Sequence, residues 1–290
     1  MPQAGYPGAV DNIVVVGQIA RDLVLVVDEV PGSGGTSQVR QRREMLGGKG
    51  ANIAVGLAQL GAAVELVGVV GEDGVGERLV ARAAADGIGT AGVVRRGVSA
   101  LIVDLVADGW RYLEDLREPV REEDLPLDVI AAAKAVVVQL QLPPEVALKA
   151  ARSARGVVVL DGAPEEFRDE LLACADVLRA DHREAELLTG RKITSTDDAL
   201  AAARSVEGPG LVAFAVNGEG NVFVWDGGEL VLPLGDAEVV DTTGGGDAFI
   251  AALTYALTNG STPEEAARLA VKASGDTVTR PGGRPDLAGL

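Results

Sequence analysis

The chain has 290 residues, of which 47% are hydrophobic, and this is enough apolar material for the core of one large domain or two small ones. Its formal net charge of -17 disfavours nucleic acid as a partner, because a phosphate backbone repels so acidic a protein. A single cysteine and a single histidine exclude an internal disulfide, a multi-histidine zinc site and a histidine-based nucleophile triad, so acid–base chemistry falls to carboxylates.

Short β-branched segments alternate with Ala/Leu-rich segments along most of the chain. In chain order these are "NIVVVG" (12–17), "ANIAVGLAQLG" (51–61), "VELVGVVG" (64–71), "GERLVARAAADG" (76–87), and then a further series from "AAAKAVVVQLQ" (131–141) to "LVAFAVNG" (211–218). Valine on both faces of the strands is typical of a buried parallel sheet that helices cover on both sides. No linker interrupts the pattern, so we expect one α/β domain over residues 1–290.

Apolar runs such as "NIVVVGQIA" are too short for a membrane span, which needs ~18 residues. The N-terminus lacks the basic-then-apolar pattern of a secretory signal. We therefore expect a cytoplasmic protein with no membrane partner.

Two segments, at about 22–44 and 99–119, break the alternation. Both read as extended stretches in which polar and apolar residues alternate, as in "VSALIVDLVADGWRYLEDL". We expect them to form a small antiparallel β lid on the main sheet, with Trp110 and Tyr112 beside a "DG" turn at its tip. The same extended segment offers an edge for a homodimer through the lid.

The early glycine cluster, "LGGKGANIAVGLAQLGA" (46–62), lacks the GxxxxGK[ST] spacing of a P-loop. No GxGxxG follows the first strand, so a Rossmann dehydrogenase is also disfavoured. The adjacent glycines let the backbone approach a ligand, Lys49 supplies a donor, and Asn52 offers both donor and acceptor to a polyol. Asp22, just past the first strand, can accept from two vicinal hydroxyls.

In the late cluster, "DTTGGGDAF" (241–249), we expect a strand "AEVV", a tight turn at Gly244 to Gly246, and a helix that Asp247 opens and that runs to about Leu257. Glycine amides at a helix N-terminus form an anion cradle. Beside it, Asp247 can accept a proton from an alcohol while the amides stabilise a phosphoryl group in transfer. The alternative is a plain strand-to-helix turn with Asp247 as an N-cap.

Together, "GGKGAN" and "DTTGGGDAF" resemble the two signatures of the ribokinase-like (PfkB) sugar kinases. The resemblance extends from "VVVGQIARD" through "LRADHREAELLTG" to "VTRPGGRPD". It implies a three-layer α/β/α sandwich with a mostly parallel central sheet and a small β lid over the sugar. It also implies transfer of the γ-phosphate of ATP to a hydroxymethyl group of a small sugar, with Mg²⁺.

The resemblance also assigns roles by position. Asp247 is implied as the catalytic base, and Gly244, Gly245 and Gly246 as the anion hole. Implied sugar contacts are Asp22, Gly48, Lys49 and Asn52. An activating K⁺ is implied near Asp241, Thr243 and the carbonyls from Val278 to Gly283. Implied ATP contacts are Asp181, Glu184, Asn217, Gly218 and Gly220, and Glu184 would also hold Mg²⁺ through water.

Three positions depart from the family pattern. Asp181 replaces the asparagine of an Asn-x-x-Glu motif, and the added carboxylate favours a metal but repels phosphate. The nucleotide loop "AVNGEG" (215–220) has lost a glycine, and we expect Asn217 to adopt the left-handed conformation in its place. Gln141, also implied as a sugar contact, stands where ribokinases have a sugar-binding glutamate, which weakens the case for ribose.

Three other functions compete with a sugar kinase. A nucleoside kinase of the same family would need a stacking platform, for which 3% aromatic content leaves little beyond Trp110. A sugar-binding protein on a decayed kinase scaffold would fit the altered nucleotide positions. A glycoside hydrolase would use paired carboxylates but would not explain the three glycines.

Overall fold

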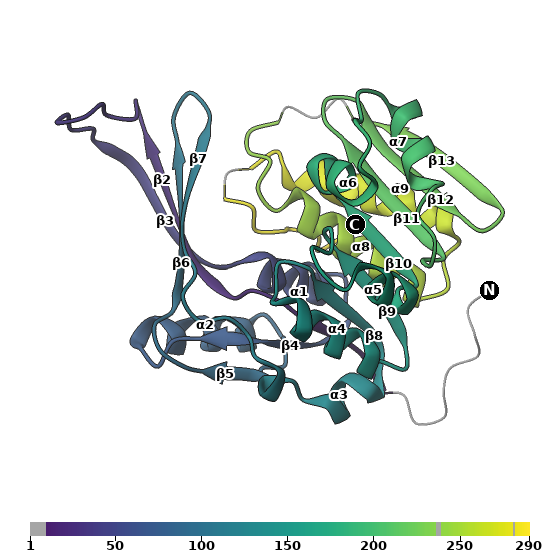
Figure 1. The fold of residues 1–290 in the computed structure, drawn as a ribbon. Helices are drawn as coiled ribbons and strands as arrows, with labels where there is room; N and C mark the ends of the chain where they lie inside the picture. The colour runs from purple at the N-terminus through teal and green to yellow at the C-terminus, as the bar shows by residue number, and fades with distance from the viewer. Residues whose placement is uncertain (1–9, 236–238, 281) are drawn as a thin grey trace.

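The computed structural model describes residues 10–235, 239–280 and 282–290, and it places a large, helix-covered sheet beside a smaller, protruding sheet (Figure 1). In these residues the large sheet has nine strands, in the order β13-β12-β11-β10-β9-β8-β1-β4-β5. The strands are β1 (Val10–Val16), β4 (Ala63–Val70), β5 (Val93–Arg95), β8 (Ala133–Gln139), β9 (Val157–Asp161), β10 (Val177–Ala180), β11 (Leu211–Val216), β12 (Gly220–Trp225) and β13 (Gly228–Pro233). Neighbours pair in parallel except at one edge, where β12 pairs antiparallel with β11 and with β13. The expected mostly parallel sheet is confirmed.

Helices cover both faces of this sheet, because alternate side chains of a strand point to opposite sides. They are α1 (Lys49–Gln59), α2 (Gly74–Ala85), α3 (Leu127–Ala132), α4 (Pro144–Ser153), α5 (Arg168–Cys174), α6 (His182–Thr189), α7 (Thr196–Ala203), α8 (Gly245–Thr258) and α9 (Pro263–Thr277), with a short 3₁₀ turn η1 (Glu122–Asp124). Val14 and Val16 pack in the core on the side of α3 to α7, whereas Ile13 and Val15 pack on the side of α1, α2, α8 and α9. The three-layer arrangement is thus confirmed.

Within the described ranges, none of these helices has both the length and the apolar character needed to cross a membrane.

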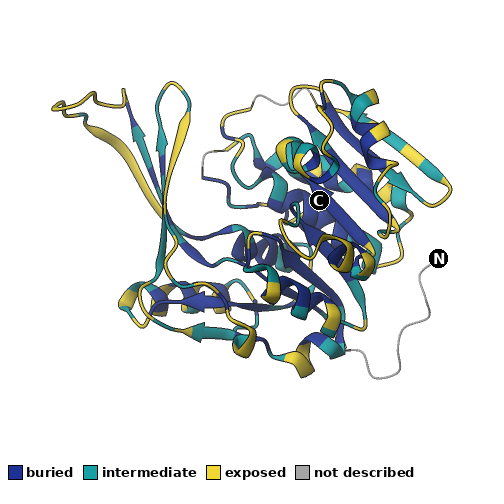
Figure 2. Cartoon of the chain, in the orientation of Figure 1, coloured by how far each residue is buried: buried dark blue, intermediate teal, exposed yellow. Residues whose placement is uncertain are grey.

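The smaller sheet is the lid expected from 22–44 and 99–119. Its order is β3-β2-β6-β7, from β2 (Ala20–Val27), β3 (Val39–Gly47), β6 (Ala100–Val106) and β7 (Trp110–Asp115). An antiparallel lid was expected, and both hairpins are antiparallel, but the central strands β2 and β6 pair in parallel. Between the two hairpins the chain returns to the main sheet through α1, β4, α2 and β5, which supplies the long connection that a parallel pair needs. The outer parts of the lid are largely exposed (Figure 2).

In the carboxyl-terminal half, one expected strand is absent and one hairpin was not expected. The strand expected at "AEVV" is absent from its described part, because Val239 and Val240 lie outside any strand and are 52% and 45% exposed. The rest of that segment lies outside the described residues. The hairpin of β12 and β13 was not predicted, since the segment after Val216 was assigned only to a nucleotide loop.

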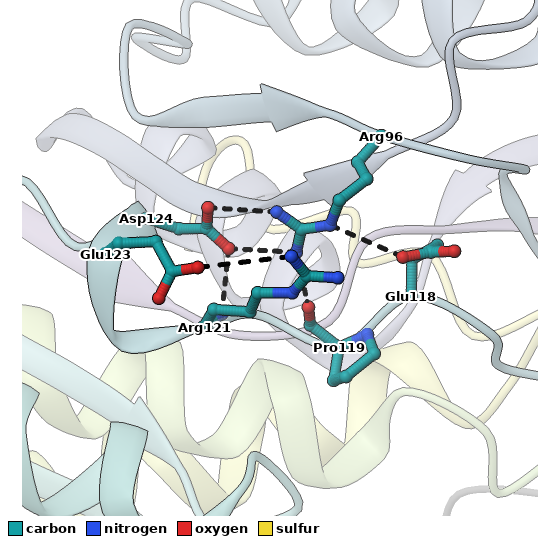
Figure 3. Close-up of polar contacts among 6 residues, drawn as sticks. All are labelled: Arg96, Glu118, Pro119, Arg121, Glu123 and Asp124. Carbon is teal, nitrogen blue, oxygen red and sulfur yellow. Dashed lines mark hydrogen bonds and ion pairs between the residues drawn. The ribbon is translucent and has the colours of Figure 1, made fainter.

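Polar contacts hold together the two connections between the lid and the main sheet (Figure 3). Arg96 follows β5 on the way into the lid, and 116–124 leads out of it. The Arg96 guanidinium donates to both carboxylate oxygens of Asp124 at 3.0 Å, to the Pro119 carbonyl at 2.7 Å and to Glu118 at 3.3 Å. Because a bidentate guanidinium–carboxylate pair fixes direction as well as distance, the entrance and exit of the lid are clamped at one point.

We predict that Arg96→Ala lowers the free energy of unfolding by about 2 kcal/mol, because it leaves the buried Asp124 carboxylate without its main partner. Urea unfolding at neutral pH measures this. Arg121→Ala is the matched control, since its guanidinium is exposed and lies 4.0 Å from Glu123 (Figure 3). Equal stability of the two variants would show that Arg96 is no clamp.

Candidate active site

The candidate site lies at the carboxyl ends of the central parallel strands, where ligands bind in open α/β sheets. Gln139 ends β8, Asp161 ends β9 and Arg179 lies near the end of β10. Helix α8 brings Asp247 to this edge, and lid strand β2 brings Asp22 close enough for the charge of Asp247 to raise its pKa. Residues from the early and the late glycine clusters therefore meet at one place.

The glycine run begins helix α8 in a space that excludes side chains. Gly244 has a left-handed φ of 70°, and a Cβ there would lie 1.7 Å from a backbone carbonyl oxygen. A Cβ on Gly246 would lie 2.7 Å from the Arg179 guanidinium. The helix starts at Gly245, two residues earlier than expected, so Asp247 lies within its first turn rather than opening it.

Two of the three glycine amides point free of the protein's own acceptors. No residue in the described ranges accepts a hydrogen bond from the amides of Gly244 and Gly246. The Gly245 amide donates to the Thr242 carbonyl at 3.3 Å, which is a long bond. The positive end of the helix dipole coincides with the two free amides, and this combination attracts anions.

Asp247 is a buried carboxylate, 6% exposed, among polar groups. Asn52 Nδ2 donates to Asp247 Oδ2 at 2.9 Å. Burial raises the pKa of Asp247 to about 6, while the charge of Lys49 opposes the rise and that of Asp161 adds to it. A carboxylate with this pKa is ionised at neutral pH and is a stronger base than an exposed aspartate.

Asp22 lies across from Asp247, over the first pair of glycines. A Cβ on Gly47 would lie 1.9 Å from the Asp22 carboxyl carbon, and a Cβ on Gly48 would lie 2.8 Å from the Gln18 carbonyl oxygen. Burial, followed by the charge of Asp247, raises the pKa of Asp22 to about 7. Its Oδ1 is buried and accepts no hydrogen bond from a described residue. An acceptor therefore faces the site without a donor from the protein.

Glu184 connects the expected sugar contacts with the expected nucleotide contacts. Glu184 Oε1 accepts from Gln141 Nε2 at 2.9 Å and lies 3.9 Å from Lys49 Nζ. Asp181 and Glu184 cap helix α6 reciprocally, because each backbone amide donates to the other's carboxylate, at 2.7 Å and 2.9 Å. Asp181 thus keeps the capping role that an asparagine has at the same position. Burial lowers the pKa of Lys49. The charges of Asp161, Glu184 and Asp247 outweigh this effect and hold the pKa above its ordinary value.

In the nucleotide loop, the expectation that Asn217 adopts the left-handed conformation was wrong. Positive φ angles fall on Gly218, at 76°, and on Gly220, at 152°, and not on Asn217. Glycine takes the strained positions because the loop is the turn of a hairpin between β11 and β12. Among the described residues, no hydrogen bond or ion pair joins this loop to Asp181 or Glu184.

Asp241, expected near a K⁺ site, is 1% exposed. Its Oδ1 accepts from the Thr243 amide at 2.9 Å and its Oδ2 from the Gly282 amide at 2.7 Å. The Val278 carbonyl already accepts two amide hydrogen bonds, at 2.9 Å and 3.1 Å. The Gly283 carbonyl lies against Gly244.

Three charged residues of the site were missed by the sequence analysis. Arg179 Nη1 donates to Asp161 Oδ1 at 3.1 Å and lies 4.0 Å from Glu184 Oε2. Asp104, on lid strand β6, is 3% exposed. Each interrupts an otherwise apolar strand, in "VVVLD", "VLRA" and "LIVDLV", and a charge inside a buried strand is the signal that could have found them.

Comparison with known proteins shows the family of this chain. Residues 10–288 match the model of the pfkB family carbohydrate kinases. The ribokinase of Bacillus subtilis is 30% identical, over 92% of each chain. Among solved structures, the ribokinase of Thermotoga maritima has a TM-score of 0.83 at 26% identity over 95% of each chain, and Arabidopsis thaliana ribokinase with ribose and ATP has a TM-score of 0.80 at 25% identity over 94% of each. The chain belongs to the pfkB family of carbohydrate kinases.

Proposed function

We propose that this protein transfers the γ-phosphoryl group of ATP to a hydroxymethyl group of a small, uncharged sugar. The observation that carries the proposal is the buried Asp247 carboxylate beside the free amides of Gly244 and Gly246. A base for an alcohol and a cradle for an anion, side by side, are the two parts that this reaction needs. The Arabidopsis thaliana ribokinase solved with ribose and ATP supports the same pair of substrates.

In the proposed step, Asp247 accepts the proton of the sugar hydroxyl as the hydroxyl oxygen attacks the γ-phosphorus. The new oxygen–phosphorus bond forms while the bond from phosphorus to the β–γ bridging oxygen breaks, and ADP leaves with those electrons. The amides of Gly244 and Gly246 hydrogen-bond the oxygens of the phosphoryl group in flight. Asn52 holds the Asp247 carboxylate in place through its hydrogen bond.

Two cations, the buried Arg179 and the half-buried Lys49, add positive charge around the transferred group. The Arg179 guanidinium lies behind Gly246, and its Nη1 is held by Asp161. Lys49 lies within reach of the charges of Asp161, Glu184 and Asp247. In a chain of net charge -17, these local groups are what allows a nucleotide to approach the site.

Mg²⁺ fits the acidic pair at the start of α6, where Asp181 and Glu184 offer hard oxygen ligands. No group of three or more histidine, cysteine, aspartate or glutamate side chains in the described part of the chain forms a metal cage. Water and ATP phosphates would complete the coordination, with Glu184 acting through water. When bound, the ion would neutralise phosphate charge and lower the basicity of ADP, which makes ADP a better leaving group.

K⁺ fits the surroundings of Asp241. This carboxylate is buried but forms no ion pair with any residue in the described ranges. A monovalent cation held by Asp241 and by the carbonyls of Thr243 and Gly283 would neutralise it. Because the Val278 carbonyl already accepts two hydrogen bonds, we expect it to contribute less than the others to binding the cation. A bound cation here would fix the turn from which α8 begins.

A nucleoside is less well supported as the acceptor than a sugar. Trp110 lies at the exposed tip of the lid and is 40% exposed, and the Tyr112 hydroxyl is bound to the Thr243 hydroxyl. Of these two rings only Trp110 is free, which leaves a nucleobase a single stacking platform, at the outer end of the lid. A sugar-binding protein without catalysis would have no need of the Asp247 base or of the adjoining free amides.

We further propose that two copies associate through their lids. Side chains alternate along β2 and β6, so Leu23, Leu101 and Val103 lie on the face opposite to Asp22. These three are only partly buried, and Leu113 of β7 is 60% exposed. Burying an apolar sheet face of this kind against the lid of a second copy is more favourable than leaving it exposed to water.

Loss of the base should lower turnover without abolishing sugar binding. Asp247→Asn should lower kcat by about 100-fold or more while leaving sugar binding nearly unchanged, because the amide keeps the shape but accepts no proton. A coupled ADP-release assay and sugar-induced thermal stabilisation measure the two quantities. The exposed Asp226→Asn is the control. Turnover of the Asp247→Asn variant near that of the control would reject the assigned base.

The raised pKa values of two site carboxylates predict how the activity depends on pH. Asp22 and Asp247 carry pKa values raised to about 7 and about 6, so the pair is protonated at lower pH and ionised at higher pH. We expect kcat/KM to rise with pH through this range and then to level off. Lys49→Met should move the rise to higher pH, because the Lys49 charge lowers the pKa of Asp247. A rise at unchanged pH in the variant would contradict the electrostatic role of Lys49.

A further inference from the structure

The lid carboxylate Asp104 lies in a setting that is unfavourable without a ligand. It is 3% exposed, and neither carboxylate oxygen accepts a hydrogen bond from any described residue. Burial and the carboxylate of Asp241, which lies within hydrogen-bond reach, disfavour the charged form of Asp104 and raise its pKa to about 6. A buried polar group left without a partner costs about 1–3 kcal/mol, and a charged one costs more. A donor from outside the chain would remove that cost.

The strand register turns Asp104 toward the reacting groups. In the parallel pair of β2 and β6, Asp104 lies beside Val24 and Ile102 beside Asp22. Because side chains alternate along a strand, Asp22, Val24 and Asp104 share one face of the lid. The charges of both Asp247 and Asp104 act on Asp22, so the three carboxylates border a common space.

The neighbours of Asp104 have already used their donors. Tyr112 lies opposite Asp104 in the β6–β7 hairpin, but its hydroxyl is bound to the Thr243 hydroxyl. The carboxylate of Asp241 is occupied by the amides of Thr243 and Gly282. When Asp104 is ionised, none of these groups offers it a donor, so a molecule bound between the lid and the main sheet would complete its hydrogen bonding.

We propose that Asp104 is a specificity-determining residue that accepts a hydrogen bond from a sugar hydroxyl distant from the one that is phosphorylated. This proposal rests on the proposed function. The Cα atoms of Asp22 and Asp104 are roughly 8 Å apart by strand geometry, so one small sugar spans both. A wall of carboxylates selects neutral, hydroxyl-rich sugars and rejects sugar acids and sugar phosphates by like-charge repulsion.

The test compares wild type, Asp104→Asn, Asp104→Leu and the control Asp108→Asn, a carboxylate exposed in the turn of the same lid hairpin. The probes are D-ribose, 2-deoxy-D-ribose, D-fructose and D-gluconate, each with ATP. For the best neutral sugar, Asp104→Leu should raise KM about 10- to 100-fold and change kcat little, since the contact binds substrate and transition state alike. D-Gluconate should be a poor substrate of wild type and should gain relative to the neutral sugar in Asp104→Asn.

Thermal stability without sugar gives a second measurement that a purely structural role would not reproduce. Asp104→Asn should melt at a higher temperature than wild type, because it removes an unpaired charge beside Asp241, and the stabilisation by the neutral sugar should shrink. A lower melting temperature with undiminished sugar stabilisation would make Asp104 a structural residue and overturn the proposal.

Three kinetic outcomes separate the remaining possibilities. If wild type phosphorylates none of the probes, the proposed function fails and this inference fails with it. If wild type is active and Asp104→Leu has the KM of Asp108→Asn, only the role of Asp104 is overturned. If KM for sugar is unchanged but the K⁺ concentration needed for activity rises, Asp104 serves the cation near Asp241 and not the sugar.

Discussion

The proposed site depends on keeping one buried carboxylate ionised beside a turn whose free amides suit an anion. Burial pushes the pKa of Asp247 upward, whereas Lys49 and Asn52 pull it down, and the balance leaves a base that works at neutral pH. The first turn of α8 supplies amides in the same place, because Gly244 and Gly246 leave the backbone bare. Neither half would serve phosphoryl transfer alone, and the shared helix end fixes their distance.

The lid completes the site with acceptors rather than donors. Asp22 Oδ1 and both carboxylate oxygens of Asp104 accept no hydrogen bond from the described chain, so a hydroxyl-bearing ligand beneath the lid would offset the cost of burying them. The Arg96 clamp holds the two connections of the lid to the main sheet. A neutral sugar bound beneath the lid would offset the repulsion among these carboxylates.

Local patterns predicted the fold well and the site in part. Valine-rich strands, helix ends and the two glycine clusters lie where their residue types dictate, so Asp247 and Asn52 could be chosen from sequence. The Asp161–Arg179 pair and Asp104 could not be chosen in this way, because their place in the site depends on neighbours distant in the chain. Which residue of a loop takes a positive φ also depends on the hairpin around it, and so the expectation for Asn217 failed while Gly218 took that conformation.

The most direct test is a crystal structure with a sugar substrate, ADP and aluminium fluoride, which mimics the phosphoryl group during transfer. Our account predicts fluorine atoms about 3 Å from the amide nitrogens of Gly244 and Gly246, and the acceptor hydroxyl of the sugar hydrogen-bonded to the Asp247 carboxylate. A fluoride group bound elsewhere, with those amides directed away from it, would contradict the account.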